Sequence, residues 1–502
     1  MKRRAGFEGE RSTSKRALSV SLKLACVGLA MEAVYLTFFL ARFPLIRYYR
    51  TDTDLGGIGG HSVVAFIAFA APLATLFGLL LVGWRLTRDA GGKSAPYIIL
   101  GFGALFAFTL CFVYPVTAID VFTYVAQGRI LIHYHQNPIF VPPSAHPHDA
   151  AMYLAGGWMS YGAPYGPLGI LVDALPVLTA GGSVLGSLVL LKMMFGAMLL
   201  GAAVGVWLVL RALAPHAALS GFVLVAWSPL ALFESVVNGH NDIAMMLLVV
   251  FGLLALVRGR LLTGLVLVFA SCLIKYGSFP LVPLALVFAL SRPAPWLWRL
   301  RLGLEAMGCW TAITITAFAP FWRGWSTFSR PLAEGGFHLQ TFGSALSFFI
   351  PSVPLGSATT LGQILFVPLY VYCLVLATRR PRDFVTGLFL GSFGSLALAA
   401  ANVKIWYAVW PATLAPLSRG AVRLAGFVLS VTATLSAVLY DFVFLWVGNG
   451  SLAPFPMINA WAYVVAFVPA ALAFLPAIGM KRRQAAVQPK RESAADSRSP
   501  AA

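Results

Sequence analysis

Acidic side chains are scarce in this sequence, so each one beside an apolar segment is a candidate for chemistry. The chain has 502 residues but only 17 aspartates and glutamates. An ionisable group at membrane depth costs about 2.5–3.5 kcal/mol on insertion scales, so such a group is a functional candidate by default. We interpret Glu32 and Glu305 as polar contacts between helices. The acids in or beside apolar segments are Glu32, Asp120, Asp173, Glu234, Asp242, Glu305 and Asp441.

Asp120 begins a stretch of helical character that runs from about Ile119 to Ile132. On a helix, Tyr124 and Gln127 follow at i+4 and i+7 and share the face of Asp120. A carboxylate on such a polar, aromatic face at a membrane surface is a candidate general base. Arg129 follows Asp120 by nine residues, which places it about half a turn away from the face of Asp120 on a continuous helix. It is therefore a candidate ligand only if the helix breaks at Gly128. An interfacial helix with an incidental acid is the alternative.

A second polar cluster is the segment 238–242, NGHND, at the junction of two apolar segments. The side chains of His240, Asn241 and Asp242 could bind hydroxyls, a phosphate or a metal ion. A capped turn with glycine at its tight corner is the alternative. Capping does not explain His240 or the nearby Glu234, so we keep the cluster as a candidate binding site.

Two isolated lysines also fall next to apolar segments. Lys275 lies at a break between two short apolar segments, and Lys404 begins another that contains Trp406 and Tyr407. A lysine beside aromatic rings at the membrane surface could pair with a lipid-linked phosphate. A side chain that extends along the membrane to reach the interface is the alternative.

The segment from Tyr161 to Leu168 is rich in Tyr, Gly and Pro, so it predicts a rigid aromatic wall for a carbohydrate or a lipid headgroup. Tyr165 is its candidate ligand. His146, His148 and Asp149 precede it and could suggest a metal site. They have no second ligand cluster at a fixed spacing, which favours a solvated loop. The sequence therefore predicts no firm cofactor and leaves a divalent metal open.

Long apolar segments must position these side chains. The chain is 59% hydrophobic and 11% charged, whereas soluble domains carry about 25% charged residues. Windows of about 17–25 apolar residues can each cross a membrane as a helix. The sequence therefore predicts an all-α integral membrane protein with about 14 transmembrane helices, and at least 12. The predicted segments are 18–42, 62–84, 96–116, 186–211, 217–236, 241–257, 262–276, 279–291, 303–320, 360–378, 384–401, 404–418, 422–443 and 458–478.

The basic residues orient these segments. The net charge is +19, but the charges form short clusters between apolar segments, which argues against nucleic-acid binding. With both termini in the cytoplasm, 27 of the 36 lysines and arginines lie on the cytoplasmic side. We therefore predict a multi-pass plasma-membrane domain over residues 18–478, a cytoplasmic basic tail at 1–17 and a disordered cytoplasmic tail at 479–502. Two long external loops cover about 117–185 and 321–359, and the first is helical beside the membrane.

Four short patterns occur in one order along the chain. They are DVFTYVAQGR from Asp120 with Asn137-Pro138, PYGPL from Pro164, NGHND from Asn238 and KIWY from Lys404 with Pro411. With these patterns the chain resembles the GT-C superfamily of integral-membrane glycosyltransferases, and most closely the actinobacterial polyprenol-phosphomannose-dependent alpha-mannosyltransferases. The family's tryptophan after the Gly-Pro-Leu pattern is Gly169 here. Three predicted helices precede Asp120, as in the mannosyltransferase branch.

The resemblance implies a GT-C-like fold, an acidic base at Asp120 and a polyprenyl-phosphate sugar donor, usually of mannose. The acceptor would be a glycan or glycolipid of the cell envelope, reached on the external face among membrane lipids. The rest of the sequence is consistent with a lipid-linked donor, because it contains no segment long enough for a soluble nucleotide-sugar-binding domain and no glycine-rich phosphate loop. One carboxylate suffices for a single displacement that inverts the anomeric centre. Lys275, Lys404 and Arg129 are the candidate cations for the leaving phosphate.

Two other functions compete with this interpretation. A lipid-linked sugar flippase or transporter would line a central path with charges from both sides and often contain internal repeats. The sequence shows no repeat, and its polar clusters are predicted on one face. A non-catalytic envelope-assembly protein would carry the same scaffold without activity.

Overall fold

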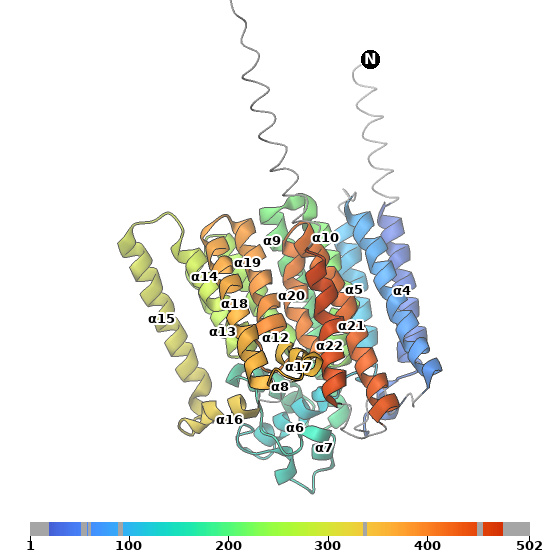
Figure 1. The fold of residues 1–502 in the computed structure, drawn as a ribbon. Coiled ribbons are helices and arrows are strands. Elements are labelled where there is room, and N and C mark those ends of the chain that lie inside the picture. The colour runs from blue at the N-terminus through green and yellow to red at the C-terminus, as the bar shows by residue number, and fades with distance from the viewer. Residues whose placement is uncertain are drawn as a thin grey trace, which may run out of the picture.

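The computed structural model describes residues 20–51, 58, 62–88, 94–334, 339–448 and 455–474, and every regular element among them is helical. Besides the helices, the described part contains two isolated β-bridges, one of which joins Pro44 to Val113. The predicted tails at 1–17 and 479–502 lie outside the described residues. Figure 1 shows a bundle of helices packed side by side.

Seven helices in the described part are long and apolar enough to cross a membrane. An eighth passage is formed if α10 (Ala218–Ala226) and the bent segment after it, α11 (Pro229–Leu232) with η5 (Phe233–Val237), count as one. An all-α membrane protein is therefore confirmed, but the count of about 14 passages is not. The seven are Val20–Leu40, α4 (Val63–Arg88), α9 (Val184–Leu213), α15 (Trp296–Phe318), α18 (Leu355–Thr378), α21 (Ala421–Gly448) and α22 (Phe455–Leu472).

The remaining predicted segments are also helical, but they are shorter than the roughly 20 residues that cross a membrane core. Tyr276–Ser278 (η6) separates two of them, as the predicted break near Lys275 requires. Because these helices are short or bent, fewer helices are long enough to cross a membrane than the hydrophobic pattern predicts. These helices are α5 (Ala95–Cys111), α12 (Asp242–Val257), α13 (Leu261–Cys272), α14 (Leu281–Leu290), α19 (Pro381–Gly394) with η8 (Ser395–Ala399), and η9 (Ile405–Ala408) with α20 (Val409–Leu414) and η10 (Ala415–Leu417).

The two long loops fold together at one end of the bundle, at the bottom of Figure 1. The Asn137 amide donates to the carbonyl of Phe321 at 2.8 Å, which joins the first loop to the second. The first loop is helical, as predicted. The helices gathered here are α6 (Asp120–Ile132), η2 (Pro143–Ala145), α7 (Ala150–Tyr153), η3 (Gly156–Trp158), α8 (Pro167–Thr179), α16 (Ser326–Glu334) and α17 (Phe342–Phe349).

Arginine-containing connections between helices also contact one another. Arg382 donates to the carbonyl of Leu213, and Arg292 donates to the carbonyl of Arg379 at 2.8 Å. These contacts bring together connections that the charge pattern assigns to the cytoplasm. The grouping agrees with that pattern, and the side of the membrane stays a prediction.

The helix α15 stands at the edge of the bundle (Figure 1) and has tryptophans near both ends. Trp296 is 70% exposed at its start, and Trp325 is 82% exposed beyond its end. Exposed tryptophans at both ends of an apolar helix are typical of the two membrane interfaces.

Glu305 of α15 forms an exposed ion pair with Arg301 of the same helix at 2.7 Å. Its interpretation as a contact between helices is therefore wrong.

Candidate active site

Asp120 is the first residue of α6 and follows an extended connection from α5. Lys192, buried in α9, donates to the carbonyl of Val113 in this connection. The Asn238 amide donates to the Thr117 hydroxyl at 2.7 Å. These contacts fix the backbone that leads to Asp120, and the second ties it to the NGHND segment.

The NGHND segment is a tight turn between η5 and α12. Gly239 has φ +67°, a left-handed conformation that favours glycine. A Cβ atom there would lie 2.8 Å from Cγ2 of Val121. Glycine therefore lets the turn lie directly against the start of α6. This close approach places the two polar clusters of the sequence in one site.

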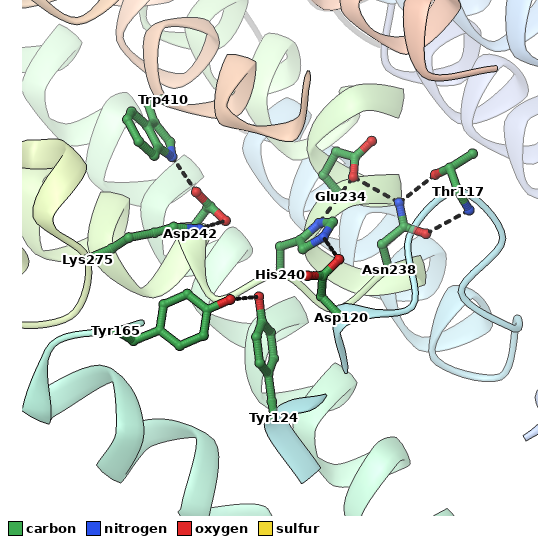
Figure 2. A network of polar contacts seen from close by, with 10 residues as sticks. All are labelled: Thr117, Asp120, Tyr124, Tyr165, Glu234, Asn238, His240, Asp242, Lys275 and Trp410. Carbon is green, nitrogen blue, oxygen red and sulfur yellow. Dashed lines mark hydrogen bonds and ion pairs between the residues drawn. The ribbon is translucent and has the colours of Figure 1, made fainter. Parts of the chain in front are cut away.

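His240 lies between two carboxylates (Figure 2). Its Nε2 is 3.5 Å from Oδ2 of Asp120, and its Nδ1 is 3.2 Å from Oε2 of Glu234. Oε2 of Glu234 also accepts a hydrogen bond of 2.8 Å from the Asn238 amide. The Trp406 ring stacks on the imidazole, with centroids 4.3 Å apart and an angle of 12° between the planes. The imidazole is therefore fixed both at its edges and on one face.

This arrangement favours the charged forms of both His240 and Asp120. Burial lowers the pKa of His240, but the two neighbouring carboxylates outweigh it and raise that pKa to about 9. Burial raises the pKa of Asp120, but His240, Lys404 and Lys275 outweigh it, so the pKa falls below its ordinary value. At neutral pH, Asp120 is a carboxylate held beside an imidazolium.

A second buried ion pair lies next to the first cluster. Lys275 donates to Oδ2 of Asp242 at 2.7 Å, and the Trp410 indole donates to Oδ1 of Asp242. The Lys275 ammonium lies 4.6 Å from the ring centroid of Tyr407 and 5.5 Å from that of Tyr165. The positive charge of Lys275 is thus compensated by Asp242 and covered by aromatic rings.

The PYGPL segment packs directly on the backbone that precedes Lys275. The Gly166 amide donates to the carbonyl of Ile274 at 3.1 Å, and the Leu168 amide donates to that of Leu273 at 2.9 Å. A Cβ atom at Gly169 would lie 2.6 Å from the carbonyl oxygen of Ile274. This chain therefore has no room for the tryptophan that the resembling family has at this position.

These elements enclose a cavity of about 600 Å³. Asp120 is the single carboxylate on its wall, among the residues that the structure describes. The polar part of the wall also includes Gln127, Lys275, Asn402 and Lys404. The aromatic part comprises Trp158, Tyr161, Tyr165, Tyr276, Trp406, Tyr407 and Trp410, and the apolar part includes Pro280, Phe366, Leu396 and Ala399.

About half of the residues that line the cavity lie in a region with known relatives. A family model described as the N-terminal domain of alpha-(1→6)-mannopyranosyltransferase matches residues 47–291. Alpha-(1→6)-mannopyranosyltransferase A of Mycobacterium tuberculosis is 27% identical over 320 residues, which are 61% of this chain and 59% of that protein. Residues 47–291 of this chain therefore resemble that glycosyltransferase family. The match to the curated relative spans about three fifths of that protein's length.

The site residues predicted from the sequence fall into three groups. Asp120, Gln127, Tyr165, Lys275, Lys404, Trp406 and Tyr407 line the cavity. Tyr124, His240, Asn241 and Asp242 are buried behind the wall. The Tyr165 hydroxyl donates to that of Tyr124 at 3.3 Å. The Asn241 amide donates to Oδ2 of Asp173 at 3.1 Å, and burial raises the pKa of Asp173 to about 8.

Arg129 forms the third group and does not line the cavity. Its guanidinium contacts Oδ2 of Asp149 at 2.7 Å and donates to the carbonyl of Gly182 at 2.9 Å. The helix α6 continues through Gly128, where a Cβ atom would lie 2.7 Å from Cγ2 of Val177 in α8. The condition for placing Arg129 at the site, a break in the helix, is therefore not met.

Two of the first-loop side chains that could suggest a metal site have other contacts. His146 stacks on Tyr134 with centroids 3.6 Å apart, and Asp149 pairs with Arg129. Among the described residues, no group of three or more His, Cys, Asp and Glu side chains could hold a metal ion.

Several residues of the site were not predicted from the sequence. Glu234 was recognised as an acid beside an apolar segment and as a neighbour of the NGHND segment, but its contact with His240 was not predicted. Trp158 on the cavity wall was not singled out. Trp410 follows Trp406 by one helical turn, a spacing that places both on one face. Lys192 is an isolated lysine inside an apolar segment. It carried the same signal as Lys275 and could have been found by it.

Proposed function

We propose that this protein transfers a mannosyl group from a polyprenyl-phosphate donor to a glycan or glycolipid of the cell envelope, with inversion. The carrying observation is that Asp120 is the single described carboxylate on the cavity wall. An enzyme that retains configuration usually needs two carboxyl groups at the reacting centre. One general base suffices for direct displacement.

In the proposed reaction, Asp120 takes the proton of the acceptor hydroxyl as its oxygen attacks the anomeric carbon. The new carbon–oxygen bond forms on one face of the sugar, and the bond to the phosphate oxygen breaks on the other. The polyprenyl phosphate leaves with that electron pair. A β-linked donor therefore gives an α-linked product, in agreement with the linkage in the names of the family and the relative.

Lys404 is the cation that we assign to the donor phosphate. Among the described residues, Lys275 has an ion pair with a carboxylate, whereas the contacts of Lys404 are with aromatic rings. The Lys404 ammonium lies 5.4 Å from the ring centroid of Trp158 and 5.7 Å from that of Trp406. A phosphate in the cavity would compensate this charge and would lie on the aromatic side of the site.

The apolar part of the wall suits the isoprenoid chain of the donor. Pro280, Phe366 and Leu396 come from the helical part of the bundle, whereas Trp158 comes from the folded loop. The donor would thus enter from the lipid and the acceptor from the loop side. The proposal includes a topology of 14 passages through the plasma membrane with both termini in the cytoplasm. The site then lies on the external face, as the distribution of basic residues indicates.

The test is transfer by the purified protein in liposomes, with polyprenyl-phosphate-mannose and a panel of mannose-containing acceptors. We expect α-linked product from the wild type and none above background from Asp120→Asn. Glu305→Gln is the matched control, because that carboxylate lies in an exposed pair outside the cavity. Movement of the donor lipid across the bilayer without transfer would replace the proposal by a flippase. Full activity of Asp120→Asn would remove Asp120 as the base.

A further inference from the structure

We infer that His240, held between Glu234 and Asp120, is a positioning residue that aims the Asp120 carboxylate into the cavity and sets the pH range in which it works. This inference rests on the proposed function, because it assigns His240 a role in that reaction. It gives the NGHND segment a purpose other than ligand binding.

The position of His240 between two carboxylates favours hydrogen on both of its ring nitrogens. A carboxylate oxygen lies 3.2 Å from Nδ1 and another lies 3.5 Å from Nε2. A neutral imidazole has one N–H, so one carboxylate would face a lone pair. Only the imidazolium attracts both carboxylates. The side chain is also 1% exposed, so water does not replace either partner.

Contacts on the side of His240 that faces away from Asp120 hold the imidazole ring in place. The ring therefore keeps its position when the Asp120 carboxylate gains or loses a proton. Asn238 holds Glu234 at 2.8 Å and also holds Thr117, which precedes Asp120 in the chain. The Trp406 ring covers one face of the imidazole. Glu234 in η5, His240 and Asp120 therefore form a row of side chains (Figure 2), and Asp120 at its end lines the cavity.

The charged groups around Asp120 show why His240 has a large effect on the protonation of that carboxylate. Lys404, Lys275 and His240 act on Asp120, and Asp242 compensates Lys275 at 2.7 Å. Tyr124 and Tyr165 also lie in the cluster and their pKa values are raised, so they are uncharged at neutral pH. Asp173 has a pKa of about 8 and is mostly uncharged there. His240 is the cation in contact with Asp120, so its removal leaves burial as the dominant influence.

The sign of the effect follows from this balance. Burial raises the pKa of Asp120, and His240 is the largest influence that lowers it. Without the imidazolium, the base is protonated at a higher pH than in the wild type. The acid limb of the rate profile must then move upward, whereas a purely structural defect lowers the rate at every pH by the same factor.

The experiment measures kcat/KM for transfer between pH 4 and pH 9 in the wild type, His240→Gln and Glu234→Gln. We expect the acid limb of His240→Gln to move up by at least about one pH unit, and that of Glu234→Gln to move in the same direction by less. His216→Gln, at an exposed histidine, is the matched control and leaves the profile unchanged. An unmoved limb in both variants would overturn the inference.

A second measurement does not depend on transfer. In protein labelled with ¹³C in its eight histidine rings, the His240 signal is the one absent from His240→Gln. We expect the shifts of an imidazolium at pH 7.5, and those of a neutral ring would overturn the inference. A wild type that shows the imidazolium but transfers no sugar would contradict the proposed function alone.

Discussion

The buried pair of Lys275 and Asp242 gives a prediction whose size can be derived from its surroundings. The two side chains are 9% and 2% exposed, and one contact of 2.7 Å joins them. Replacing Lys275 by Met leaves the Asp242 carboxylate with the Trp410 indole as its remaining described donor. Removing one partner of a buried ion pair costs about 3–5 kcal/mol. We expect Lys275→Met to lose stability in this range.

The reverse substitution, Asp242→Asn, should cost less. Its amide oxygen can still accept from Trp410, and the Lys275 ammonium keeps the rings of Tyr407 and Tyr165. Cation–π contacts offset part of the lost pairing, each by about 0.5–2 kcal/mol. We expect a loss of about 1–3 kcal/mol. Transfer should also fall less than in Asp120→Asn, because Asp242 lies behind the cavity wall.

The double variant tests the reasoning. Lys275→Met with Asp242→Asn contains no unpaired charge, so it should be more stable than Lys275→Met by about 2 kcal/mol or more. Unfolding by denaturant in detergent micelles, followed by tryptophan fluorescence, gives the four midpoints of the cycle. Losses that simply add in the double variant would show that the two charges do not depend on each other and would refute the argument.

Three further substitutions separate the cavity from its supports. Lys404→Gln should raise the donor KM by at least about tenfold, because a charged hydrogen bond to phosphate contributes about 1.5–3 kcal/mol; an unchanged donor KM in a transfer assay would remove Lys404 from the phosphate site. Arg129→Gln should weaken the loop through loss of its pair with Asp149 while leaving the donor KM unchanged, and a raised KM would return Arg129 to the site. Gly169→Ala should lower the denaturation midpoint, because its Cβ meets the carbonyl oxygen of Ile274 at 2.6 Å; a midpoint equal to that of the wild type would contradict this packing.

The sequence predicted what depends on local spacing. Asp120 and Gln127 share the cavity wall because a helix places i and i+7 on one face. The break near Lys275 and the turn at Gly239 were marked by glycine and proline. The helical segments were found from hydrophobic runs, but a run does not specify whether its helix is bent, short or membrane-crossing.

Pairing between distant segments could not be predicted in this way. Lys275 and Asp242 are 33 positions apart, and Trp410 and Asp242 are 168 apart. Nothing in local spacing specifies that these side chains meet, because tertiary packing brings their helices together. The same limit concealed the role of Glu234, which depends on its approach to His240.

The charges of the site suggest how substrate binding and proton transfer are connected in the proposed reaction. Glu234, His240 and Asp120 carry one net negative charge, the pair of Asp242 and Lys275 carries none, and Lys404 carries one positive charge. Without the donor these charges cancel, and an anionic donor adds one unbalanced negative charge. When Asp120 takes the proton of the acceptor, its carboxylate becomes neutral and the leaving phosphate gains that negative charge, so the net charge of the site does not change. The charge that the donor phosphate adds would make Asp120 a stronger base at the moment when the acceptor must be deprotonated.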